Sequence, residues 1–166
     1  RWGRGFALNN IDLSIKTGEI FALIGPKGAG KTSLFNCITG SPALYEGSIL
    51  FNDEDIRGRT PHHIARLGII RTFQGSHVFS EMTVLTNLLL ARRSFYRHNV
   101  FSAGLFSSRV RQEEAHNRGM VELLIDMFQL QHARKSPAGE LPCGMSKRLE
   151  IARALAMSPS FLLLDE

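Results

Sequence analysis

The stretch EIFALIGPKGAGKT, residues 19–32, places a continuous apolar run directly before a glycine-rich turn and a lysine. An unbroken apolar run entering a glycine predicts a strand over residues 19–25 that is buried on both faces. The turn GPKGAGKT, residues 25–32, matches the pattern GxxxxGK(S/T) and precedes a helix predicted over residues 31–39. Its glycines let backbone N–H groups close around a phosphate, which the start of a helix also attracts. The stretch therefore predicts an α/β fold with a phosphate-binding loop.

A second motif, FLLLDE at residues 161–166, is an apolar run that ends in two acids. Asp165, at the end of a buried strand, can hold Mg²⁺ through water, and Glu166 can orient or deprotonate an attacking water. In the phosphate loop, Lys31 is expected to reach the β- and γ-phosphates, and the Thr32 hydroxyl is expected to bind Mg²⁺. Together the two motifs predict a site that binds and hydrolyses a nucleoside triphosphate.

The remaining hydrophobic pattern predicts further strands and a block of helices. Strands are expected at residues 11–16, 47–52 and 68–73, and helices at residues 61–68, 84–93, 113–128 and 146–157, with Thr83 capping the second helix and Ser146 starting the last. The strands bracket the helical block, which runs from about residue 75 to residue 157. This order predicts a parallel α/β core with a helical insertion.

Composition describes a soluble, globular chain, since 43% of the 166 residues are hydrophobic and 21% are charged. Cys37 and Cys143 do not suggest a disulfide framework, and the sequence shows neither a signal peptide nor an apolar run long enough to cross a bilayer. The chain begins at arginine and stops after FLLLDE, as expected of a fragment.

The net charge of +5 is partly local, because six arginines and two acids lie between Arg92 and Arg118. That region is either a solvated helical face or a surface that meets lipid or a membrane partner.

Four features, in this order, resemble the ATP-binding subunit of ABC transporters. They are the phosphate loop at residues 25–32, a Q-loop glutamine at Gln74, a signature motif at residues 141–145 and a Walker B motif at residues 161–166. The segments ALNNIDLSIKTGEIFALIGPKGAGKTSLFNCITG, IARLGIIRTFQ, VFSEMTVLTNLLLA and RLEIARAL resemble, within that family, the ATPases of high-affinity branched-chain amino acid importers. The resemblance covers nearly the whole chain.

The resemblance implies a P-loop NTPase fold with a RecA-like parallel sheet. Residues 1–74 and 158–166 would form the nucleotide-binding core of a single ATPase domain, and residues 75–157 would form the α-helical subdomain that carries the signature. The chain would be truncated after the Walker B strand.

The resemblance also assigns roles to individual residues, with ATP and Mg²⁺ as the ligands. Nucleotide would be bound by Trp2, which stacks on adenine, and by Gly25, Pro26, Lys27, Gly28, Ala29, Gly30, Lys31, Thr32 and Ser33. The catalytic residues would be Glu166, Lys31 and Gln74. The metal would be held by Thr32, Gln74 and Asp165. The ATP of a partner subunit would be contacted by Leu141, Pro142, Cys143, Gly144 and Met145.

The partners implied by the resemblance are a second ATPase subunit, identical or different, and the subunits of a membrane permease. The segment 75–84 would dock a cytoplasmic helix of that permease, and a solute-binding protein would act indirectly. The protein would lie at the cytoplasmic face of the membrane as a peripheral subunit, with no nucleic acid bound. ATP-driven closure of the dimer would power the import of branched-chain amino acids or related small polar solutes.

The signature LPCGM departs from the family pattern LSGGQ. Pro142 has neither a hydroxyl nor an N–H to offer a phosphate, and Met145 removes a further polar contact. Lys27 replaces a usual asparagine and adds charge near the phosphates. Two alternatives therefore stay open: a soluble ATPase of the same superfamily, and a nucleotide-binding subunit whose hydrolytic site has degenerated.

Overall fold

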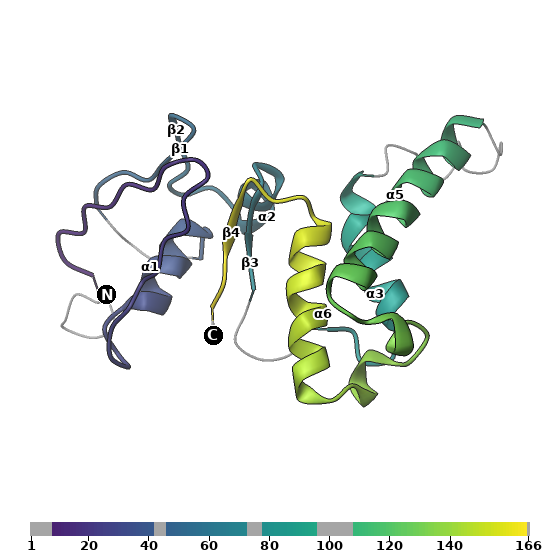
Figure 1. The fold of residues 1–166 in the computed structure, drawn as a ribbon. Helices are drawn as coiled ribbons and strands as arrows, with labels where there is room; N and C mark the ends of the chain where they lie inside the picture. The colour runs from purple at the N-terminus through teal and green to yellow at the C-terminus, as the bar shows by residue number, and fades with distance from the viewer. Residues whose placement is uncertain (1–7, 42–45, 73–77, 96–107, 166) are drawn as a thin grey trace. The chain divides into compact units, whose positions relative to one another are not determined.

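The computed structural model describes residues 8–41, 46–72, 78–95 and 108–165 (Figure 1). The chain forms two compact units, residues 1–69 and residues 70–166. The phosphate loop lies in the first unit, and the signature and Walker B motifs lie in the second.

Helix α1 (Lys31–Ile38) and helix α2 (Pro61–Arg66) are the helices described in the first unit, and both confirm the sequence prediction. The last turn of α1 is closed by the Thr39 hydroxyl, which donates to the Phe35 carbonyl oxygen at 2.8 Å. Helix α2 starts where its sequence signals predict. The Thr60 hydroxyl accepts from the His63 N–H, proline occupies the first helical position, and Gly68 follows with a left-handed φ of 97°.

Strands β1 (Leu50–Phe51) and β2 (Glu54–Asp55) form an antiparallel hairpin in which Leu50 faces Asp55. Its two turn residues, Asn52 and Asp53, have φ values of 50° and 65°. Two consecutive positive φ values match the turn type whose twist suits a two-residue hairpin. After the hairpin, the Arg57 side chain bonds the Asp55 carboxylate and lowers its pKa to about 2.

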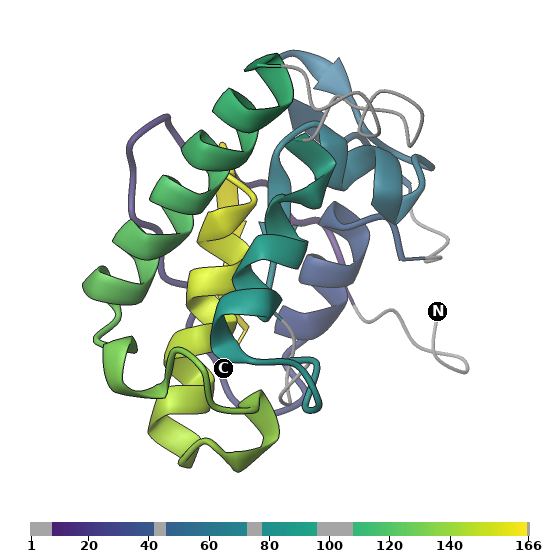
Figure 2. The ribbon, with the colours of Figure 1, turned by 90° about the vertical axis from the view of Figure 1, so that its right-hand side faces the viewer.

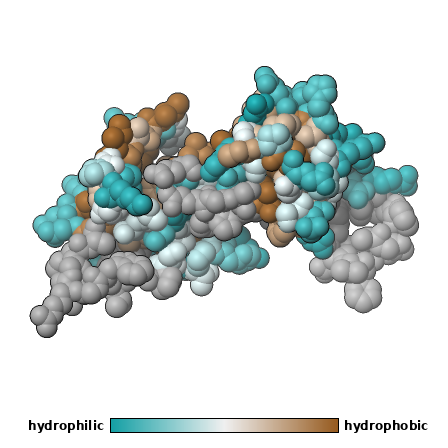
Figure 3. Space-filling view, turned by 90° about the horizontal axis from the view of Figure 1, so that it is seen from below, coloured by the Kyte–Doolittle hydropathy of each residue, from teal (hydrophilic) through white to brown (hydrophobic). Residues whose placement is uncertain are grey.

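The predicted strands at residues 11–16 and 19–25 are wrong for this structure, because neither segment is a strand. The side chain of Ile20 is 100% exposed and that of Ile24 is 92% exposed, whereas the prediction placed both in a core. A strand needs a neighbour to pair with, and the described sheets pair β1 with β2 and β3 with β4. Hydrophobic residues thus reach the surface, as brown patches show on the face drawn in Figure 3.

The second unit holds a two-stranded sheet built from β3 (Ile69–Arg71) and β4 (Phe161–Leu163), which are far apart in the sequence. Thr72, directly after β3, donates its N–H to the carbonyl oxygen of Leu163, the last residue of β4, at 3.0 Å. Both strands therefore leave the sheet at the same edge, as parallel neighbours do. This arrangement places Asp165, which follows β4, beside Thr72, which follows β3.

Three helices pack side by side in the second unit (Figures 1 and 2): α3 (Val84–Ala91), α5 (Ser108–Met127) and α6 (Cys143–Ala156). Short 3₁₀ turns lie at Arg92–Phe95, Gln131–Ala133 and Ala138–Glu140. Thr83 caps α3 as predicted, because its hydroxyl accepts from the Thr86 N–H at 3.1 Å. Helix α6 begins three residues earlier than predicted, at Cys143 rather than Ser146.

The apolar faces of these helices meet in one hydrophobic core. Its buried members are Val84, Leu88, Val121, Leu124, Ile125, Leu130, Ala133, Ala138, Leu149, Ala152 and Ala156. On α6, Met145, Leu149, Ala152 and Ala156 recur at intervals of four, three and four residues, and they form the face of the helix that packs into this core. Among the described residues, no helix combines the length and the apolarity needed to cross a membrane.

A buried arginine connects the helical bundle to the entry of β4. Arg92, only 4% exposed, donates to the Asn117 side chain on α5, to the Ala156 carbonyl at the end of α6 and to the Ser158 hydroxyl. A guanidinium at this position also meets the negative end of the α6 dipole. Arg92 therefore fixes where α6 ends and where the chain turns toward β4.

The hairpin turn yields a stability prediction. Asp53→Gly should raise the free energy of unfolding by about 0.5–1 kcal/mol, because glycine adopts the left-handed conformation without the cost that a β-carbon adds. Urea denaturation measures the change. Asp53→Ala is the matched control, since it removes the carboxylate but keeps the strained backbone. Equal stabilisation by both substitutions would mean that charge, not conformation, is the cause.

Candidate functional site

The phosphate loop has an open, glycine-dependent backbone. Gly28 and Gly30 adopt left-handed φ values of 87° and 92°, and Gly30 caps α1 without any side-chain bond. A β-carbon added at Gly28 would meet nothing within 4 Å, so glycine is required there for conformation rather than for space. The Ala29 N–H donates to the Pro26 carbonyl oxygen at 3.2 Å and tightens the turn. The loop thereby ends at the N–H groups of the first turn of α1.

The Lys31 side chain folds back across this loop. Its ammonium donates to the Gly25 carbonyl oxygen at 2.6 Å and to the Pro26 carbonyl oxygen at 3.0 Å. An ammonium has three N–H donors, so these two bonds position it without using all of its capacity. The positive charge is held at the start of α1, where the helix dipole and unpaired N–H groups also favour an anion. This combination suits a phosphate group.

The residues after Lys31 add hydroxyl groups to the same turn. The Thr32 side chain is exposed and that of Ser33 is half-buried. An exposed hydroxyl in the first turn of the helix is free to face a ligand bound to the loop. The predicted nucleotide residues from Gly25 to Ser33 thus form one continuous stretch of the first unit.

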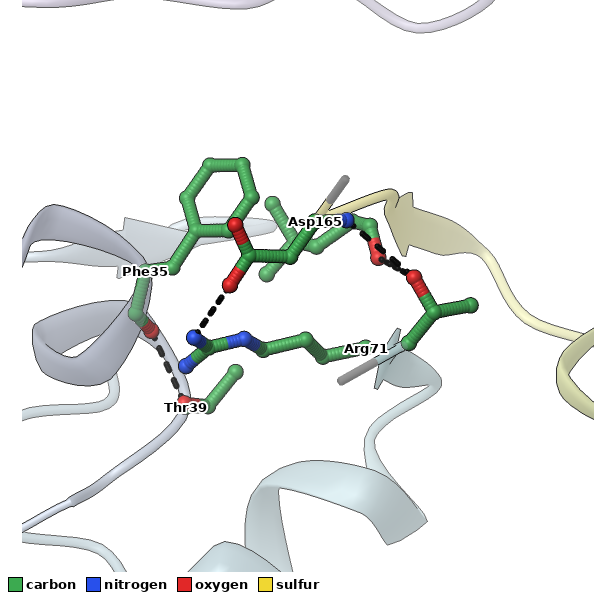
Figure 4. Close-up of polar contacts among 6 residues, drawn as sticks. Phe35, Thr39, Arg71 and Asp165 are labelled. Carbon is green, nitrogen blue, oxygen red and sulfur yellow. Dashed lines mark hydrogen bonds and ion pairs between the residues drawn. The ribbon is translucent and has the colours of Figure 1, made fainter. Parts of the chain in front are cut away.

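Asp165 follows β4 in the second unit and is held at two points (Figure 4). Its N–H donates to the Thr72 hydroxyl at 3.1 Å, and its carboxylate Oδ2 lies 2.6 Å from Nη2 of Arg71. The exposed fraction is 5% for the Arg71 side chain and 9% for that of Asp165. The Arg71 guanidinium thus lies directly beside the buried carboxylate of Asp165.

The oxygen donors predicted for Mg²⁺ have suitable chemistry. Thr32 offers a hydroxyl and Asp165 a carboxylate, and both are the hard oxygen ligands that Mg²⁺ prefers. The part of the chain that the structure describes holds no group of three His, Cys, Asp or Glu residues fit for a metal. A metal bound mainly through nucleotide phosphates needs only one or two protein ligands, so this donor set fits it.

The signature residues Leu141–Met145 lie at the start of α6. Pro142 is the N-cap of this helix, with φ −55° and ψ 148°, and it makes no side-chain capping bond. The side chain of Cys143 is exposed, as is Gly144, and a β-carbon at Gly144 would meet nothing within 4 Å of this chain. No described residue of this chain would therefore obstruct a larger side chain at position 144.

Met145 has a structural role in addition to its place in the signature. The side chain is half-buried and packs against the hydrophobic core of the helical bundle. The Met145 N–H donates to the Pro142 carbonyl oxygen at 2.9 Å, inside the first turn of α6. A thioether here replaces a polar side chain but also adds apolar packing.

The loop before α3, expected to meet a permease, is held from inside by Asn87. This side chain is fully buried, and its amide nitrogen lies within 3.2 Å of the carbonyl oxygens of Phe79, Met82 and Thr83. Its amide oxygen accepts from the Phe79 N–H at 2.9 Å. Phe79 and Met82 turn outward, with side chains 46% and 37% exposed. The loop thus presents two apolar side chains on a fixed backbone.

Three residues with predicted roles lie outside the described residues: Trp2, Gln74 and Glu166. Conversely, sequence reading did not identify Arg71, Thr72 or Asn87. A pattern of residue types gives no sign that Arg71 meets a carboxylate more than 90 positions away. The one available signal was that Arg71 interrupts an apolar strand just before Gln74.

Comparison with known proteins places these features among ABC transporter proteins. A profile of the ABC transporter family matches residues 8–166. The chain is 42% identical over 168 residues to the high-affinity branched-chain amino acid transport ATP-binding protein LivG of Escherichia coli K12. It is 38% identical over 167 residues to BraF of Pseudomonas aeruginosa PAO1, which carries the same description. Both matches cover 100% of this chain and 65% of the relative, so the chain spans about two thirds of their length.

Solved structures agree with the sequence relatives. A nucleotide-free ATP-binding cassette from an ABC transporter superposes with a TM-score of 0.77 at 31% identity, covering 100% of this chain and 65% of that one. A dimeric cassette in a post-hydrolysis state, bound to ADP and Pi, superposes with a TM-score of 0.76 at 26% identity, covering 96% and 66%. The predicted fold class, an ATP-binding cassette of the P-loop NTPase type, is confirmed.

The cap of α6 yields a second stability prediction. Pro142→Ser should stabilise the protein by about 0.5–1 kcal/mol, because a serine hydroxyl at the N-cap can accept from an N–H of the first turn. Met145→Gln should destabilise it by about 1–2 kcal/mol, because it places an amide against the apolar core. Chemical denaturation of the two single variants measures both changes. A stabilising Met145→Gln would contradict the packing role of Met145.

Proposed function

Because the chain belongs to the ABC transporter family, we propose that the full-length protein is an ATP-hydrolysing subunit of an importer. The solutes proposed are branched-chain amino acids or related small polar molecules. The names of the relatives LivG and BraF support this substrate class. The peripheral position proposed, at the cytoplasmic face of the membrane, follows from the same relationship.

The observation that carries the ATPase proposal is the geometry around Lys31. An ammonium held at 2.6 Å and 3.0 Å by two loop carbonyls sits at a helix start with two left-handed glycines before it. A β-phosphate entering this loop would meet backbone N–H groups, and Lys31 would exchange its carbonyl partners for phosphate oxygens. The exchange costs little, since a charged phosphate is a stronger acceptor than a carbonyl.

In the proposed mechanism, Lys31 would bind the β- and γ-phosphates. Thr32, Asp165 and Gln74 would hold Mg²⁺, which would neutralise charge on the phosphate oxygens. Glu166 orients the attacking water and accepts its proton. Trp2 stacks on the adenine face. Pro26, Lys27 and Ala29 would line the phosphate loop.

The proposed assembly places ATP between two subunits. The signature of one subunit, residues 141–145, would contact the nucleotide held by the phosphate loop of the other. The dimeric neighbour with ADP and Pi supports this arrangement. Permease subunits would dock on the loop that carries Phe79 and Met82, and a solute-binding protein would deliver the substrate. We place the nucleotide-binding core at residues 1–74 and 158–166 and the helical subdomain at residues 75–157.

The altered signature favours an asymmetric version of this function. Pro142 offers neither a hydroxyl nor an N–H, so the loss of a charge-assisted contact should cost roughly 1.5–3 kcal/mol of closed-dimer stability. The site that receives LPCGM would therefore bind ATP but turn it over slowly. A site completed by an intact signature from a different partner would remain fast.

Two variants test the function in the full-length assembly with its permease. Lys31→Ala should abolish ATP hydrolysis, because the main side-chain charge on the phosphates is lost. Glu166→Gln should keep ATP and Mg²⁺ bound and accumulate the closed dimer, because it removes only the base. ATP turnover and size-exclusion chromatography distinguish the two. Hydrolysis at the parental rate in Lys31→Ala would refute the ATPase proposal, and in Glu166→Gln it would remove Glu166 as the base.

The weakened signature has its own test. Pro142→Ser in the full-length assembly should raise ATP turnover, since it restores a hydroxyl without disturbing the packing of Met145. Turnover per assembled complex is the measurement, and Ser146→Ala, on the same helix, is the control for general effects on α6. An unchanged rate in a correctly assembled complex would show that the family serine is dispensable here.

A further inference from the structure

Arg71 and Asp165 form a buried ion pair at the proposed magnesium site. Nη2 of Arg71 lies 2.6 Å from Oδ2 of Asp165, and both side chains are at least nine-tenths buried. The ion pair belongs entirely to the second unit and joins the end of β3 to the end of β4. Burial weakens screening by solvent, so the guanidinium acts strongly on anything that approaches this carboxylate.

The backbone beside the pair is also fixed. The Thr72 hydroxyl accepts from the Asp165 N–H at 3.1 Å, and the Thr72 N–H donates to the Leu163 carbonyl oxygen at 3.0 Å. Thr72 therefore holds the main chain of Asp165, and its neighbour Arg71 holds the carboxylate. In Figure 4 one carboxylate oxygen points to Arg71, while the other turns away from it.

The charge balance of the site changes when a metal arrives. In the structure, the Asp165 carboxylate already has the Arg71 guanidinium beside it. A divalent cation that uses the same carboxylate meets a fixed positive charge within a few ångströms, and this repulsion opposes metal binding. The Arg71 guanidinium already contacts this carboxylate, so the carboxylate is expected to bind a metal ion less tightly.

We propose that Arg71 is the resident counter-ion of Asp165 and that it sets the magnesium concentration at which nucleotide binds. This inference rests on the proposed function, in which Asp165 holds the metal of the nucleotide. Arg71 is a positioning residue: it orients the Asp165 carboxylate, and its positive charge opposes a metal ion that uses the same carboxylate.

The test uses the full-length protein and the magnesium dependence of fluorescent-ATP binding. Arg71→Gln should lower the magnesium concentration at half-maximal binding about tenfold, because it removes the repelling charge. Arg71→Lys should stay close to the parent, since it keeps the charge. Arg57→Gln is the matched control: it breaks the exposed ion pair of Arg57 with Asp55, 2.7 Å long, and should leave the magnesium dependence unchanged.

A second measurement needs neither metal nor turnover. In EDTA, Arg71→Gln should lower the melting temperature, because it leaves the buried Asp165 carboxylate uncompensated. Adding Asp165→Asn to Arg71→Gln should restore much of that loss, since both charges are then absent.

The outcomes separate the two proposals. Equal magnesium midpoints in Arg71→Gln and the parent, or a purely additive loss in the double variant, would overturn the role of Arg71 and leave the ATPase proposal intact. A higher midpoint in Arg71→Gln would also overturn it, since Arg71 would then support metal binding instead of opposing it. Absence of nucleotide binding in the parent protein would overturn both.

Discussion

The hydrogen bond from the Thr72 N–H to the Leu163 carbonyl oxygen closes the long helical excursion of the second unit. The chain leaves the sheet after β3, builds three packed helices and returns as β4 beside the strand it left. The entropic cost of closing this long connection is small, because that cost grows slowly with loop length. Burial of the hydrophobic core between the helices offsets it. This return of the chain positions Asp165, which follows β4.

The phosphate loop and Asp165 are held in place by contacts of two different kinds. The phosphate loop depends on local backbone conformation, because its two left-handed glycines and the Lys31–carbonyl bonds all lie within a few residues of one another. Asp165 depends on contacts between distant segments, since Arg71 and Thr72 reach it from the other strand. The first kind of site survives most changes elsewhere in the chain, while the second is sensitive to how the helical block is packed.

Local signals explain which parts of the structure the sequence could predict. Capping residues predict the starts of two helices: Thr60, followed by Pro61, for α2, and Thr83, followed by an apolar run, for α3. Both helices begin where expected. Pro142 carries no such side-chain signal, so the start of α6 was placed three residues late, at Ser146. The apolar run at residues 19–25 predicted burial, but burial of a strand depends on partners that a local pattern does not contain.

The site shows the same limit. Gly25 to Thr32 could be assigned from spacing alone, because the motif is contiguous and its geometry is local. The partner of Asp165 could not, because the arginine that neutralises it lies on a strand more than 90 positions earlier, and only the β3–β4 pairing brings them together. Asn87 was missed for a similar reason, since its four hydrogen bonds go to a loop whose path no pattern reveals.

Asn87 has a consequence for how this surface can diversify. The buried amide of Asn87 bonds the main chain of the loop before α3, so these contacts do not involve the side chains of Phe79 and Met82. Exchange of those side chains for others of different size leaves the internal amide contacts in place. Relatives that keep the asparagine are thus free to evolve new contact residues at these two positions while inheriting the same scaffold beneath them.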